Sequence, residues 1–125
     1  AAAGSASAQD YRAKVPMGFS IGTADMTPGP YQILVKTGGG SPLVVFRNLA
    51  THNSAILVAS VRSDAPKAWR REGKPLIVFT CVQGKCAVAK LWDGLATSAY
   101  QFPAPKLRGA EAERASITIA LTKAD

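Results

Sequence analysis

The chain has too few of several residue types for most kinds of site chemistry. It contains one histidine, His52, two cysteines, and no apolar run near the roughly 20 residues that span a bilayer. Zinc and calcium sites need several clustered ligands, and the sequence offers no such cluster. A catalytic triad would have to use His52 with Asp25 or Asp64, and their spacing does not support one. We therefore expect no catalytic residue, metal, cofactor or transmembrane segment.

What the chain does have is enough apolar residues to build a core. Of its 125 residues 47% are hydrophobic, which indicates one folded domain. Fifteen Lys and Arg against eight Asp and Glu give a net charge of +7, spread along the chain. Such a charge favours solubility and attracts anionic surfaces, polysaccharides or nucleic acid.

The two cysteines stand in the segment Cys81-Val82-Gln83-Gly84-Lys85-Cys86, between two apolar runs. A two-residue turn at Gln83-Gly84 would place Cys81 opposite Cys86 in a non-hydrogen-bonded pair, with Cα atoms about 4.5 Å apart. A disulfide can bridge that distance, whereas redox pairs usually have Cys-x-x-Cys spacing on a helix. The segment predicts a disulfide-linked hairpin and an oxidising compartment.

The N-terminal residues point to the same compartment. Residues 1–9 are almost all Ala, Gly and Ser, in an arrangement typical of a signal-peptidase cleavage site. We interpret the chain as a secreted, extracellular protein whose leader has been removed.

Apolar residues alternate with polar ones in several short runs separated by turn signals. In the first run, over 11–21, Pro16 indicates an edge position or a bulge. The pattern predicts an all-β fold, an antiparallel β-sandwich of seven to eight strands with one short C-terminal helical turn. The expected strands cover residues 11–21, 31–36, 43–47, 55–62, 75–82, 85–92, 99–102 and 116–122, the helical turn lies in 106–115, and a polar loop covers 63–74.

One motif suggests hydrolysis without its structural context. Residues 18–22 match Gly-x-Ser-x-Gly, with Ser20 as the nucleophile. A nucleophile elbow needs a helix after the serine, and residues 23–30 cannot form one. We therefore read Ser20 as a strand residue and the protein as a non-enzyme.

A second segment suggests a binding surface. Lys67, Trp69, Arg70, Arg71 and Lys74 place an aromatic ring among cations. Such a loop stacks on a sugar or base and contacts anionic groups. It gives the alternative function of a secreted module that binds an anionic glycan or the cell envelope, without specific nucleic-acid recognition.

The order of motifs resembles a group of small secreted bacterial β proteins without assigned function. The matching motifs are Val15-Pro16-Met17-Gly18-Phe19, Pro28-Gly29-Pro30-Tyr31, Leu76-Ile77-Val78-Phe79, Leu91-Trp92 and Glu113-Arg114. The resemblance implies secretion and a β fold, and it implies no activity.

The layout also resembles pilins that assemble by donor-strand complementation. Residues 43–46, 55–59 and 76–79 are apolar on both faces, more than a two-layer sandwich buries. We divide the chain into an extended segment, 1–10, and a β-sandwich domain, 11–125. The main functional hypothesis is a subunit of an extracellular, pilus-like homopolymer. Its donor residues would be Ala1, Ala3, Ser5 and Ser7, with Tyr11 and Val15 as apolar anchors.

Overall fold

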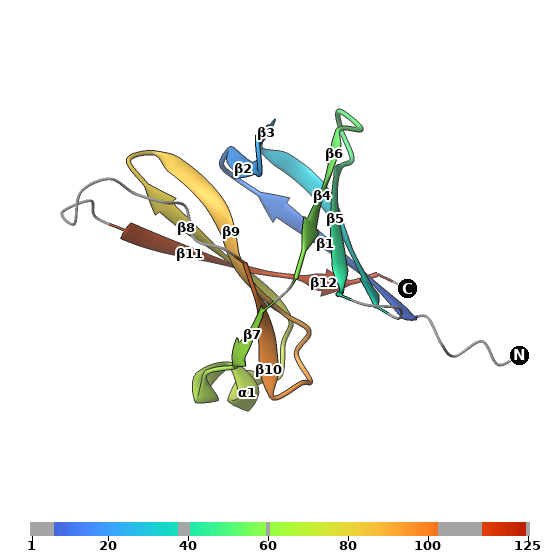
Figure 1. Cartoon of the computed structure of the whole chain (residues 1–125), viewed down its shortest axis with the longest axis vertical. Coiled ribbons are helices and arrows are strands. Elements are labelled where there is room, and N and C mark those ends of the chain that lie inside the picture. The colour runs from blue at the N-terminus through green and yellow to red at the C-terminus, as the bar shows by residue number, and fades with distance from the viewer. Residues whose placement is uncertain (1–6, 38–40, 60, 103–113, 125) are drawn as a thin grey trace, which may run out of the picture.

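The protein folds into two β-sheets, as the computed structural model shows for residues 7–37, 41–59, 61–102 and 114–124 (Figure 1). Sheet A has the strand order β12-β1-β4-β5-β6. Sheet B has the order β11-β8-β9-β10-β7, with β2 against β9 and β3 against β2. The elements are β1 (Ser7–Val15), β2 (Phe19–Ile21), β3 (Ala24–Met26), β4 (Gly29–Thr37), β5 (Leu43–Asn48), β6 (Ser54–Val58), β7 (Val61–Asp64), α1 (Lys67–Glu72), β8 (Leu76–Val82), β9 (Lys85–Trp92), β10 (Ser98–Gln101), β11 (Arg114–Ala120) and β12 (Thr122–Lys123). The all-β class is confirmed.

The described residues form twelve strands, more than the predicted seven to eight, partly because two runs are divided between the sheets. The run over 11–21 is divided at Pro16, which cannot donate a hydrogen bond to a strand ladder. Before Pro16 the chain is β1 in sheet A, and after it β2 pairs with β3 and β9 in sheet B. The run over 55–62 becomes β6 in sheet A and β7 in sheet B.

One hydrophobic core joins the two sheets. The alternating residues Tyr11, Val15, Phe19 and Ile21 are all buried in it, so the pattern correctly gave the inward face on both sides of Pro16. Phe19 lies between the sheets, with its ring 5.2 Å from Tyr31 of β4 and 5.1 Å from Phe79 of β8, centroid to centroid. A smaller cluster holds Trp92, Ala65 and Ala99, with Trp69 and Leu76 packed against it.

The helix is not where the sequence predicted it. The predicted polar loop contains α1, which ends at Gly73 in the left-handed region at φ 67°, with the Gly73 N–H bonded to the Trp69 carbonyl. The predicted C-terminal helical turn over 106–115 lies outside the described residues as far as 113. Its last two residues, Arg114 and Ala115, are in strand β11, so the helical assignment is wrong there.

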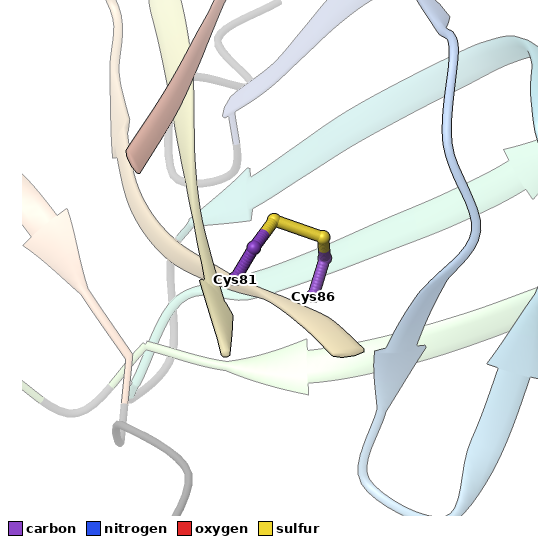
Figure 2. Close-up of a disulfide and its surroundings, with 2 residues drawn as sticks. All are labelled: Cys81 and Cys86. Atoms are coloured by element: carbon purple, nitrogen blue, oxygen red, sulfur yellow. A yellow bond between two sulfur atoms is a disulfide. The ribbon is translucent and has the colours of Figure 1, made fainter. Parts of the chain in front are cut away.

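The disulfide hairpin is as predicted. Strands β8 and β9 place Cys81 opposite Cys86, with the sulfur atoms bonded at 2.02 Å and Cα atoms 4.0 Å apart (Figure 2). Gln83 and Gly84 form the two-residue turn, both with positive φ, at 51° and 79°. Two positive φ values are what a type I′ hairpin turn requires.

A buried asparagine shapes the turn that leads into β6. Asn48 is the one buried polar residue among those described, and its Oδ1 accepts hydrogen bonds from the N–H groups of Ala50 and Thr51. Its Nδ2 donates to Thr27 Oγ1 at 3.2 Å. The turn also places His52 at φ 67°, so side-chain and backbone features together fix where β6 begins.

Candidate functional site

The outer strands of the two sheets differ in how they are protected from pairing with another chain. Strands β12, β3 and β7 are short outer strands that carry charges, at Lys123, Asp25, and both Arg62 and Asp64. Short length and charge are the usual ways in which a sheet edge avoids pairing with another chain. Strand β6 has no charged residue, and β11 has none after Arg114 at its start. We call these two outer strands the β6 edge and the β11 edge.

The β6 edge presents free backbone groups over alternate residues. The Ala59 N–H bonds to the Pro42 carbonyl at 2.9 Å, and this fixes the phase of the antiparallel β5–β6 ladder. Because bonded pairs alternate, the N–H and C=O groups of Ser54, Ile56 and Val58 point away from β5. No strand among the described residues is hydrogen-bonded to β6 on that side.

Aliphatic side chains cover the outer face of sheet A beside this edge. Directly paired residues share one face of a sheet, which places Leu34, Val45 and Ile56 in one row and Leu43 and Val58 in the next. Ile56 is 58% exposed, Val58 50% and Leu43 38%, while Leu34 and Val45 are half-buried. We call these five residues the outer patch. The predicted two-faced apolar character of 43–46 and 55–59 is therefore visible as exposed surface.

Residues 76–79 differ from the other two-faced runs. Ile77 and Phe79 lie in the main core, and Val78 is buried at 8% exposure. Leu76 is half-buried against the smaller core cluster, so this run adds little exposed apolar surface.

The β11 edge is longer than the β6 edge and borders the core. Leu121 N–H bonds to the Pro75 carbonyl, which sets the ladder phase so that backbone groups of Ser116, Thr118 and Ala120 point outward. On the inner face, Ile117 and Ile119 pack against the main core but stay half-exposed. No further strand pairs with β11 in the described part of the chain.

The predicted donor residues divide into two groups. Ala1, Ala3 and Ser5 lie outside the described residues. Ser7, Tyr11 and Val15 belong to β1 and pair with Thr37, Ile33 and Gly29 of β4 in the same chain. The boundary drawn between residues 10 and 11 thus falls inside one strand.

The predicted anionic-ligand residues lie on and beside α1. Lys67, Arg70, Arg71 and Lys74 are exposed. Trp69 packs against the smaller core cluster, its ring 6.2 Å from that of Trp92, so it anchors the helix. Trp69 is half-buried in this contact, and its predicted role in ligand binding stays a prediction.

The residues weighed for hydrolysis make separate local contacts. Ser20 Oγ lies 3.5 Å from Asp25 Oδ1 across the β2–β3 pair. His52 Nδ1 lies 3.5 Å from Arg47 Nη2, and this contact is on sheet A. The structure therefore gives Ser20 and His52 different partners.

Two features of these surfaces were not found from the sequence. The edge positions of β6 and β11 depend on strand order, which local patterns do not reveal. The one available signal was the lack of charge from Asn53 to Val61 and from Ala115 to Thr122. The buried role of Asn48 was hidden because the segment reads as an ordinary turn.

Two further observations concern cations and membranes. Within the described ranges, no group of three or more His, Cys, Asp or Glu side chains is placed to hold a metal ion. Nor does the described part of the chain contain a helix of the length and apolarity needed to cross a membrane.

No known protein family, curated protein or solved structure matches the chain.

Proposed function

We propose that the protein is a structural subunit of a secreted, extracellular filament, built as an antiparallel β-sandwich and assembled head to tail. Residues 1–6 of one copy add as an extended strand to the β11 edge of the next. Such a contact joins two different surfaces, and repetition without closure gives an open polymer. The observation that carries the proposal is the β11 edge, unprotected by charge and bordered by half-exposed Ile117 and Ile119.

The lengths of donor and acceptor agree. Six extended residues span about 20 Å, and a seven-residue strand such as β11 spans about 23 Å. A donor strand there would satisfy the outward backbone groups of Ser116, Thr118 and Ala120 and cover the two isoleucines. Because Ala1, Ala3 and Ser5 have small side chains, backbone hydrogen bonds supply most of the affinity.

The disulfide supports the extracellular setting of this proposal. Bridges such as Cys81–Cys86 persist where the surroundings are oxidising. The pairing of Ser7–Val15 with β4 limits the donor to residues that precede Ser7.

The test compares the whole chain with two variants by negative-stain microscopy and light scattering. Deletion of residues 1–6 removes the donor, and Thr118→Pro blocks the acceptor without removing a hydrogen bond within the chain, because the Thr118 N–H points outward. We expect filaments from the whole chain and from the matched control Thr118→Val, and none from either variant. Filaments of unchanged length after the deletion would refute the proposal.

A second function rests on the exposed cations of α1. Lys67, Arg70 and Arg71 lie on α1 and Lys74 follows it, while Trp69 packs the helix against Trp92. This exposed group of cations favours binding to an anionic glycan or envelope surface. Arg70→Ala combined with Arg71→Ala should weaken salt-sensitive binding to heparin, with Lys36→Ala on sheet A as control. Equal retention of both variants would count against this function.

A further inference from the structure

We propose that the β6 edge is a second self-association surface, at which two copies pair β6 with β6 antiparallel about a twofold axis through Ile56. The two five-stranded sheets would then join into one continuous sheet. This contact is separate from the proposed filament contact, because it uses neither residues 1–6 nor β11.

The backbone of β6 is symmetric about Ile56. Its outward residues are Ser54, Ile56 and Val58, so a twofold through Ile56 sets Ser54 of one copy opposite Val58 of the other. All three resulting pairs are of the hydrogen-bonded type, which gives about six backbone hydrogen bonds between the copies. If one copy were shifted by one residue along the other, the outward backbone groups of one β6 would face groups of the other β6 that already bond to β5.

The outer patch is self-complementary in the same arrangement. The row Leu34, Val45, Ile56 of one copy would continue into Ile56, Val45, Leu34 of the other, because paired residues share a face. Ile56, the most exposed of the five at 58%, would meet its own equivalent at the axis. The pairing thus packs Ile56 and Val58 against the other copy at the seam and joins the two outer patches into one continuous apolar surface.

The lack of charge on this edge favours a second copy as the occupant. The chain carries +7, so two copies repel one another over most of their surfaces. From Asn53 to Val61 there is no charged residue, and the edge strand itself lacks the lysine or proline that blocks pairing in other proteins. The β6 edge is therefore a surface where like-charged copies approach without placing cations in contact.

The first test uses cysteine cross-linking, because the twofold fixes which residues meet. Hydrogen-bonded antiparallel partners have Cα atoms about 5.5 Å apart, within reach of a disulfide. Ile56→Cys should therefore give a covalent dimer under mild oxidation. The control Ser54→Cys should cross-link at least about tenfold less, since its equivalent would lie about 14 Å away.

The second test is the concentration dependence of mass in sedimentation, on the chain without residues 1–6 so that filaments do not interfere. We expect a weak, reversible dimer that Ile56→Lys abolishes, since this change sets two cations together at the axis. Thr118→Lys makes the same charge change on the β11 edge and should leave the dimer intact. Circular dichroism checks that both variants fold.

Two results would overturn the inference. One is a monomer at every concentration together with no cross-linking of Ile56→Cys, which would assign the edge to another protein or to none. The other is equal cross-linking of Ile56→Cys and Ser54→Cys, which would exclude the antiparallel twofold. Absence of filaments from the whole chain with retention of this dimer would refute only the filament proposal, and loss of the dimer with filaments intact would refute only the twofold contact.

Discussion

Phe19 gives the strongest test of how the two sheets are held together. It lies in β2, a strand of only three residues, and is 3% exposed. Its ring contacts Tyr31 and Phe46 of sheet A and Phe79 of sheet B, with centroids 5.2, 6.0 and 5.1 Å away. A single side chain in a short strand thus connects the aromatic residues of both sheets.

The expected cost of removing this ring follows from its burial. Phe19→Ala should lower the free energy of unfolding by about 3–5 kcal/mol, the range for a buried phenylalanine that leaves a cavity. Phe19→Leu keeps much of the apolar volume but loses the edge and tilted ring contacts, each worth about 0.5–1.5 kcal/mol. Since these contacts overlap, we expect the leucine variant to lose about 1–2 kcal/mol.

Urea unfolding followed by circular dichroism measures both values, provided that the slope with denaturant stays constant. Leu95→Ala is the control, because Leu95 is 82% exposed and its removal should change stability by less than about 0.5 kcal/mol. A loss below about 1 kcal/mol for Phe19→Ala would show that the sheets do not depend on this ring, and the reasoning would fail.

Three further predictions concern other parts of the fold. Reduction of the Cys81–Cys86 bridge should cost about 2 kcal/mol, seen as a lower urea midpoint with reductant; an unchanged midpoint would contradict the estimate. Asn48→Ala should cost about 2–3 kcal/mol in the same assay, because it removes several hydrogen bonds at a buried site, and a neutral effect would argue against that role. Burial, then the charge of Asp93, raises the pKa of Tyr11 from 10.0 to about 12, so stability should be full below pH 10 and fall as pH rises towards 12. Tyr11→Phe should flatten that fall, and parallel curves for the two proteins would refute the assignment.

Local patterns predicted the inward-facing residues better than the strand connections. Alternation marked Tyr11, Val15, Phe19 and Ile21 as inward residues, because burial has the same period in either sheet. It did not reveal that the chain changes sheets after Pro16, since that depends on which strands lie nearby. The Cys81–Cys86 bridge was predictable because a two-residue turn fixes its own register.

The helix and the open edges show where sequence reasoning reaches its limit. The segment 67–72 is short and highly charged. Its helix packs through the contact of Trp69 with Trp92, a residue more than 20 positions away along the chain. The exposed apolar surface near Ile56 was anticipated from residues 55–59 having apolar side chains on both faces. The sequence did not reveal which strand of sheet A would be outermost, because strand order arises from the whole topology.

The pairing of β1 with β12 has a consequence for how the chain folds. Arg12 lies opposite Thr122, and the Ala124 N–H bonds to the Asp10 carbonyl at 2.8 Å. The run from β11 to β12 passes from one sheet to the other (Figure 1). Sheet A therefore stays without its last strand until Lys123 has left the ribosome, so completion must follow synthesis of that residue. Because β1 and β12 meet in one ladder, a circular permutant that joins Ala124 to Ser7 by a short linker and has new termini in the turn after β2 should still fold.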